Sequence, residues 1–158
     1  MRTCLFPGTF DPITLGHTDV IDRGLTLFDR VVVGIGTNSS KTPMFTLEER
    51  IAWIREIYKD DPRVEVAAYE GLTIDFCKKM DAAFILRGIR YVSDFEYEKA
   101  IADVNRTIAP HIETIFLTTT PQYSSVASTL VRDIYRHGGD VKPFLPAVVL
   151  EGIKKHKR

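Results

Sequence analysis

The run RVVVGIG at residues 30–36 is the stretch of this 158-residue chain that decides the fold. Its apolar residues are almost continuous and mostly β-branched, with no polar residue alternating between them. A strand of this kind is typical of a sheet that is covered on both faces, as parallel sheets are. We therefore predict a parallel sheet with residues 30–36 inside it.

The segments on either side alternate between strand and helix patterns. Further strands are predicted to end at Phe6 and to span residues 63–68, 82–86 and 113–117, and helices to span 17–28, 72–79 and 128–137, with a last helix from Pro146. The sequences TLEE at 46–49 and SDFE at 93–96 have the form of capping boxes and predict two more helix starts, the second helix reaching residue 108. The fold class is therefore α/β: a single domain over residues 1–158, a Rossmann-like open parallel five-stranded sheet with helices on both faces.

The charge balance of the chain excludes a strong net electrostatic field. Lys plus Arg and Asp plus Glu number 21 each, so net charge draws the protein neither to nucleic acid nor to an anionic membrane. No apolar run approaches the ~18 residues of a membrane span, and the N-terminus lacks a signal pattern. Cys4 and Cys77 lie in apolar stretches, as reduced core thiols do. We expect a soluble cytoplasmic protein with no nucleic-acid or membrane partner.

The segment PGTFDPITLGH at residues 7–17 predicts a phosphate site after the first strand. Gly8, Thr9 and Gly16 let the backbone approach an anion, and a helix starting near His17 would direct free N–H groups at it. Asp11, followed by a proline, is expected to form a turn. Polar stretches follow every predicted strand, at 7–17, 37–46, 69–73, 87–94 and 118–129. Open α/β sheets bind ligands beyond the carboxyl ends of their strands, so one rim would collect these stretches.

Two common phosphate motifs are excluded. The chain has no G-x-x-x-x-G-K-[ST] segment and therefore no Walker-type loop. The segment GIGTNS at 34–39 opens like a dinucleotide fingerprint, but it lacks the third glycine and follows the second strand instead of the first.

The tetrad Thr14-Leu15-Gly16-His17 resembles the (His/Thr)-x-Gly-His signature of the nucleotidylyltransferase superfamily. The whole run at 7–17 is similar to the phosphopantetheine adenylyltransferase family, and so are KTPMFTLEER at 41–50, RGIR at 87–90, DFEYE at 94–98, NR at 105–106 and GDV at 139–141. The resemblance implies transfer of an adenylyl group from ATP to 4′-phosphopantetheine, which gives dephospho-CoA and pyrophosphate. Since the acceptor phosphate is already a nucleophile, positioning and charge stabilisation should dominate catalysis.

The resemblance also assigns the site residues. His17 is the catalytic residue, donating a hydrogen bond to the α-phosphate; from the residue alone it would be an incidental first-turn histidine. The acceptor would contact Thr9, Lys41, Thr73 and Arg87. ATP would contact Thr9, Phe10, His17, Gly88, Ile89, Arg90, Glu98, Tyr123, Ser124, Ser125, Val126, Ala127, Ser128 and Thr129. Asp94 has a sufficient structural reason at a helix start, and a solvated-face role for Glu98 stays open.

One position departs from the family pattern. Members of this family show Ile-Ser-Ser-[Ser/Thr] where this chain has Val126-Ala127-Ser128-Thr129, so a hydroxyl is missing at Ala127. This departure favours one alternative, a non-catalytic nucleotide-sensing module. A second alternative is a superfamily member with another phosphorylated acceptor, but residues 87–90 and 94–98 argue against it.

The resemblance further implies a cofactor and an assembly. Mg²⁺ would be bound mainly through the ATP phosphates, because no Asp/His cluster has the spacing of a metal site. The resemblance also implies a homo-hexamer and feedback inhibition by coenzyme A. His111, His137 and His156 receive no catalytic role.

Overall fold

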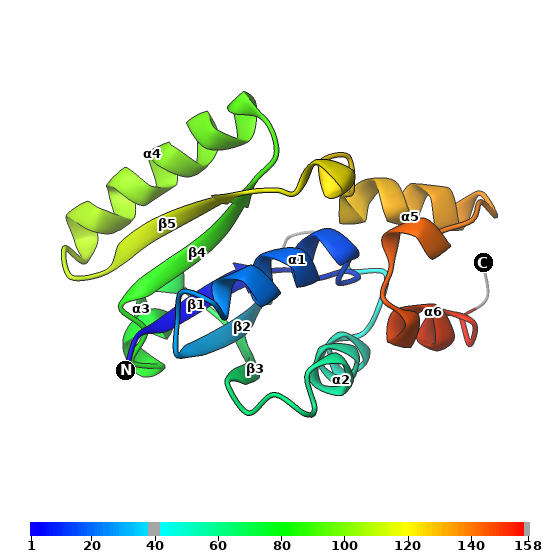
Figure 1. Ribbon diagram of the computed structural model, residues 1–158, viewed down its shortest axis with the longest axis horizontal. Helices are drawn as coiled ribbons and strands as arrows, with labels where there is room; N and C mark the ends of the chain where they lie inside the picture. Colours follow the sequence, from blue (N-terminus) through cyan, green and yellow to red (C-terminus); the bar gives the residue numbers. More distant parts are fainter. Residues whose placement is uncertain (38–41, 157–158) are drawn as a thin grey trace.

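The computed structural model describes residues 1–37 and 42–156, and its centre is one five-stranded parallel sheet (Figure 1). The strands are β1 (Thr3–Gly8), β2 (Arg30–Gly36), β3 (Val64–Tyr69), β4 (Phe84–Ile89) and β5 (Glu113–Thr118), in the order β3-β2-β1-β4-β5. Every neighbouring pair runs parallel. The predicted fold class is confirmed, and β2 has the predicted bounds.

Helices cover both faces of the sheet, as predicted. They are α1 (Leu15–Gly24), α2 (Leu47–Ile57), α3 (Thr73–Lys79), α4 (Val92–Ile108), α5 (Ser128–Arg136) and α6 (Ala147–Ile153), with short 3₁₀ turns at Pro121–Tyr123 and Lys142–Phe144. Cys4 and Val31 point into a core shared with α1, α2, α5 and α6, whereas Leu5 and Val32 point into a second core with α3. Alternate β1 and β2 residues therefore serve opposite layers.

The sheet order places the functional rim. The chain winds one way from β1 to β2 and β3 and the other way from β1 to β4 and β5, so the order reverses between β1 and β4. A crevice forms beyond the carboxyl ends of strands at such a point. Figure 1 shows α5 and α6 at the far end of the molecule from the N-terminus and α4 alongside β5.

The starts of α2 and α4 were both predicted from capping-box patterns, and the structure confirms the first of them. The Thr46 box is confirmed: its hydroxyl accepts the Glu49 N–H at 3.2 Å, and Glu49 Oε2 accepts the Thr46 N–H at 2.9 Å. The Ser93 box is wrong, because α4 begins at Val92. Asp94 accepts the N–H groups of Arg90 at 3.0 Å and Tyr91 at 3.1 Å, so this carboxylate caps the helix before Ser93 could.

Several element bounds also differ from the predictions. β1 runs on to Gly8 instead of ending at Phe6. β4 does not stop at Leu86; it runs to Ile89, because Arg87, Gly88 and Ile89 pair with β5. Arg87 is therefore a strand residue with a fixed backbone. The first helix spans Leu15–Gly24 and so starts and ends earlier than the predicted 17–28.

Cys4 and Cys77 are buried free thiols, as predicted, and burial raises the pKa of each to about 12. None of the helices in the described part of the chain has the length and apolar character that a membrane crossing needs.

Candidate active site

The Thr14-Leu15-Gly16-His17 tetrad folds into the N-terminal cap of α1. Thr14 is the N-cap residue, and its hydroxyl accepts the backbone N–H of His17 at 3.3 Å. In return, the His17 side chain accepts the backbone N–H of Thr14 through Nδ1 at 3.0 Å. This is the geometry of a capping box in which histidine takes the place of the usual Glu or Gln. The hydrogen bonds that begin the helix therefore also fix the orientation of the His17 imidazole.

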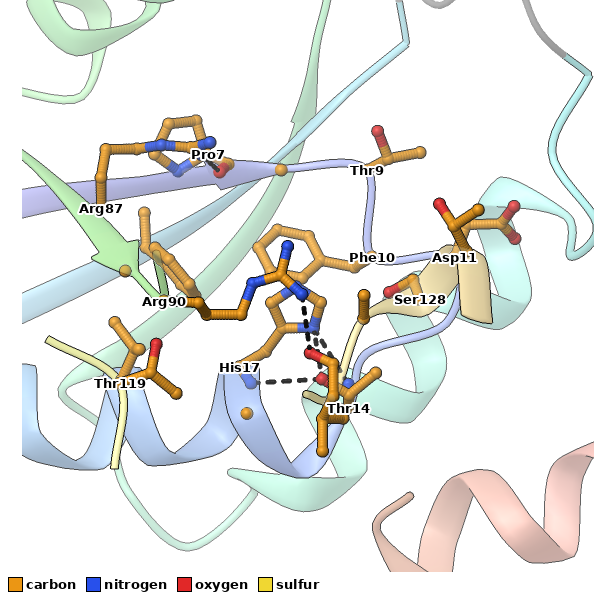
Figure 2. Close-up of a pocket in the computed structure, with 18 of the residues that line it drawn as sticks. Pro7, Thr9, Phe10, Asp11, Thr14, His17, Arg87, Arg90, Thr119 and Ser128 are labelled. Atoms are coloured by element: carbon orange, nitrogen blue, oxygen red, sulfur yellow. Dashed lines mark hydrogen bonds between the residues drawn. The ribbon is translucent and has the colours of Figure 1, made fainter. Parts of the chain in front are cut away.

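The cap also decides which nitrogen of His17 carries the proton. A nitrogen that accepts a backbone N–H cannot itself be protonated, so the neutral ring holds its hydrogen on Nε2. Among the described residues Nε2 has no hydrogen-bond partner, and the ring lines a cavity of about 710 Å³. Figure 2 shows the ring between Thr14 and Phe10, with the Arg90 guanidinium nearby. His17 therefore offers the cavity one neutral N–H donor.

The surroundings of His17 keep it uncharged. Burial, followed by the positive charges of Arg87 and Arg90, lowers its pKa to about 4. At pH 7 the ring is therefore neutral, and it takes up a proton only in acid.

Aromatic packing holds the ring from the other side. The Phe10 ring meets the His17 ring edge-on, with centroids 5.0 Å apart, and Phe6 lies 6.2 Å away. Phe10 has a positive φ of 48°, which turns its buried side chain under the histidine. A Cβ at Gly8 would lie 2.9 Å from Phe10 Cζ, so only glycine fits there.

Arg87 enters the same cavity from β4 and is held by Glu98 of α4. Glu98 accepts two hydrogen bonds from the guanidinium, at 3.0 Å from Nε and 2.6 Å from Nη2, and Arg87 Nη1 donates to the carbonyl of Pro7. The Glu98 side chain is only 12% exposed. A bidentate pair of this kind fixes the plane of the guanidinium, and its remaining N–H groups stay available to an anion.

Arg90 and the start of α5 form the opposite wall. Arg90 Nη1 lies 3.5 Å from the carbonyl of Val126, and its guanidinium lies over the Tyr91 ring. Ala127 is the N-cap of α5 and, having no hydroxyl, makes no side-chain cap. The first N–H groups of α5 are thus uncapped by that side chain, a feature that suits an anion at the helix start.

The structure gathers most of the predicted site around this cavity. The predicted residues that line it are Thr9, Phe10, His17, Arg87, Gly88, Arg90, Glu98, Val126, Ala127, Ser128 and Thr129. Thr73 lines a neighbouring cavity of about 610 Å³, which shares Thr9, Arg87 and Glu98 with the first. Lys41 lies outside the described residues. Ile89, Tyr123, Ser124 and Ser125 are not among the lining residues, and their contacts stay predictions.

The sequence interpretation missed two arginines of α5. Arg132 and Arg136 line the cavity, and Arg132 donates to the backbone carbonyl of Asp11 at 2.7 Å. A signal was present: both follow Ser128 at intervals of four, so they share its face of the helix. Counting them, four arginines meet at the rim, since Arg87 and Arg90 line it too. The cavity therefore suits a polyanionic ligand.

Comparison with known proteins agrees with this geometry. The Cytidylyltransferase-like family matches residues 5–134. The phosphopantetheine adenylyltransferase of Flavobacterium johnsoniae is 54% identical over 149 residues, covering 94% of this chain and 97% of its own. That of Phocaeicola vulgatus is 53% identical over 154 residues, covering 98% and 99%. This chain belongs to the phosphopantetheine adenylyltransferase family.

A solved structure adds evidence on the fold of this adenylyltransferase family member. A bifunctional NMN adenylyltransferase/ADP ribose pyrophosphatase from Francisella tularensis superposes with a TM-score of 0.70 at 18% identity. The match covers 91% of this chain and 44% of that one. At this identity the likeness concerns the fold alone, and it supports the predicted Rossmann-like architecture.

Proposed function

We propose that the cavity around His17 transfers the adenylyl group of ATP to 4′-phosphopantetheine, giving dephospho-CoA and pyrophosphate. The observation that carries this proposal is the hydrogen bond from the Thr14 backbone N–H to His17 Nδ1, which leaves Nε2 as the donor in a cavity that four arginines line. Membership of the phosphopantetheine adenylyltransferase family supports the choice of reaction.

The reaction needs no protein nucleophile. A phosphate oxygen of the acceptor attacks the α-phosphorus of ATP, the new P–O bond forms as the bond to the β-phosphate oxygen breaks, and pyrophosphate leaves with the electron pair. In this proposal His17 Nε2 donates to an α-phosphate oxygen as negative charge grows on it. Arg90 and the uncapped start of α5 hold the departing phosphates, and Arg87 holds the attacking one.

The two adjoining cavities suit a bipartite product. Thr9 and Arg87 line both, so a phosphate beside them would lie between the two spaces. In the second cavity Tyr69 Oη and Thr73 Oγ1 share a hydrogen bond of 2.9 Å, and Leu72 and Ile101 also line this cavity. A mixed polar and apolar wall suits the amide-containing pantetheine arm, and we place Thr73 and Lys41 on the acceptor side.

The remaining ligand contacts follow from this arrangement. Mg²⁺ arrives with the ATP phosphates, since the described residues contain no cluster of His, Cys, Asp or Glu able to hold a metal ion. Coenzyme A shares most of its structure with dephospho-CoA, so it competes for the same cavities and inhibits by feedback. The whole chain acts as one domain in the cytoplasm.

Replacing His17 tests the donor. His17→Ala removes the N–H and should lower kcat roughly 100- to 1,000-fold while ATP affinity stays nearly constant. His17→Gln supplies a neutral N–H near the Nε2 position and should keep more turnover than alanine. The measurement is pyrophosphate release with ATP and 4′-phosphopantetheine, alongside ATP titration. Unchanged turnover in His17→Ala, or equal loss in both variants, contradicts the role.

Replacing Arg87 tests the acceptor site. Arg87→Ala should weaken 4′-phosphopantetheine binding by about tenfold or more and ATP binding much less, because the lost fork faces the acceptor phosphate. Isothermal titration of each substrate measures this. The control is Arg106→Ala, whose side chain is 64% exposed and pairs with Glu113; neither residue is among those that line the two cavities. Equal 4′-phosphopantetheine affinity in Arg87→Ala and the wild type would contradict the role of Arg87 in binding the acceptor phosphate.

Helix α4 supports self-association. It buries none of its residues, although Val92, Tyr97, Val104 and Ile108 are apolar or aromatic and more than half exposed. Tyr97, Val104 and Ile108 are spaced seven and four residues apart and so share one side of the helix, and an exposed apolar side of this kind is typical of a protein interface. We propose that α4 packs against other copies, and the family resemblance gives the number as six.

The mass in solution tests this assembly. Light scattering should give six times the 17.9 kDa of one chain. Val104→Asp places a charge in the interface and should shift the mass down, whereas Lys99→Asp, a polar position of the same helix, should have less effect. A monomeric wild type contradicts the proposal.

A further inference from the structure

Two buried charged side chains beside the cavity have no part in the proposed chemistry. Asp11 and Arg50 are each only 4% exposed. Burial lowers the pKa of Arg50, while the negative charge of Asp11 acts in the opposite direction. Taking a carboxylate and a guanidinium out of water costs free energy, and apolar residues would serve a purely structural role as well. The bonds that these two groups make show what they hold.

Asp11 joins the loop between β1 and α1, residues 9–14, which we call the phosphate loop, to the segment at residues 42–46 that follows β2. Its Oδ2 accepts the backbone N–H of Met44, and its Oδ1 accepts that of Phe45, both at 2.9 Å. Thr42 and Pro43 come just before these two residues, and both line the cavity. The carboxylate therefore sets how close this segment lies to the phosphate loop.

Arg50 makes the reciprocal connection from α2. Its Nη1 donates to the carbonyl of Thr9 at 2.8 Å, and its Nε donates to the carbonyls of Phe45 at 3.1 Å and Thr46 at 3.3 Å. One planar group thus bonds to both segments that Asp11 also joins. Its rigid geometry allows little relative movement between them.

The same loop is tied to α5. Arg132 donates to the backbone carbonyl of Asp11 at 2.7 Å, and the Ser128 hydroxyl donates to the carbonyl of Pro12 at 2.8 Å. Three separate parts of the rim therefore converge on residues 9–12. A shift of this loop would move Thr9 and the Phe10 ring that supports His17.

We propose that Asp11 and Arg50 are positioning residues for adenylyl transfer. They form a buried brace that holds Thr9 and residues 42–46 at the spacing that the reacting phosphates require. The inference rests on the proposed function. Neither side chain bonds to substrate in it. Both act through the backbone groups of the phosphate loop and of the segment after β2, and Asp11 Oδ2 also pairs with Arg132 Nη1 at 3.7 Å.

Variants of Arg50 give the main test. Arg50→Met keeps the length of the side chain and removes every donor, and it should lower kcat about 10- to 100-fold, since a displacement near 1 Å can cost that much. The affinity for ATP alone should change less than about threefold, because the proposed ATP contacts lie mainly on β4 and α5. Arg50→Lys keeps one donor and should recover part of kcat. Asp11→Asn, which keeps one acceptor oxygen, should also lower kcat.

The control lies on the same helix. Arg55 donates to the carbonyl of Val66, away from the cavity, so Arg55→Met should keep wild-type kcat. Folding is followed by thermal melting and by the fluorescence of Trp53, the single tryptophan, whose ring packs against Phe45 at 5.0 Å. Release of Phe45 should shift this emission in Arg50→Met and Asp11→Asn but not in Arg55→Met.

The outcomes separate the two proposals. Absence of wild-type turnover with ATP and 4′-phosphopantetheine refutes the proposed reaction. Active wild type with folded Arg50→Met and Asp11→Asn of unchanged kcat refutes the brace. Loss of kcat without rescue in Arg50→Lys and with an equal loss of ATP affinity also refutes it, because general loosening of the site would then explain both. If Arg50→Met does not fold, Arg50→Lys and Asp11→Asn decide by the same criteria.

Discussion

The hydrogen bond from the Thr14 backbone N–H to His17 Nδ1 is the interaction on which the rest of the site depends. It belongs to the cap of α1, so the free energy that starts the helix also orients the imidazole. The same bond assigns the proton to Nε2. Burial, and after it the positive charges of Arg87 and Arg90, disfavours a second proton, so a group that must donate at neutral pH is kept neutral.

A neutral donor is a suitable choice beside four arginines. An imidazolium among them would add repulsion to the cost of burying a charge, whereas a neutral N–H contributes direction without either. The arginines supply the charge that the phosphates need, and each of the two that face His17 is held by a carboxylate: Arg87 by Glu98 and Arg90 by Asp94. The arginines thus supply the positive charge and His17 supplies the oriented hydrogen-bond donor, all at one rim of the sheet.

Much of this arrangement could be predicted from the sequence. The β-branched run at 30–36 predicted a parallel sheet, and parallel strands bring their polar carboxyl-end loops to one rim, so Thr9, Arg87 and Ser128 were expected together. The end of β4 was not predictable, because pairing with β5 carries the strand past Arg87-Gly88. The start of α4 failed for a similar reason: Asp94 reaches backbone groups outside the local Ser93 pattern.

The role of the Thr14-Leu15-Gly16-His17 tetrad could be predicted only in part. Thr-x-x-His has the spacing of a capping box, and the position of His17 three residues after the cap could have indicated its tautomer. Its pKa could not be predicted, because it depends first on burial in the folded chain and then on arginines about 70 residues away in the sequence. The brace of Asp11 and Arg50 could not be predicted either, because in the sequence Asp11 has only the pattern of a turn residue.

The most direct test of the account is a nitrogen NMR titration of the His17 imidazole in the ligand-free protein, assigned by comparison with His17→Gln. The expected result is a ring that is protonated on Nε2 alone from pH 8 down to about pH 5, with a pKa of about 4. An imidazolium at pH 7, or a neutral ring with its proton on Nδ1, would contradict it.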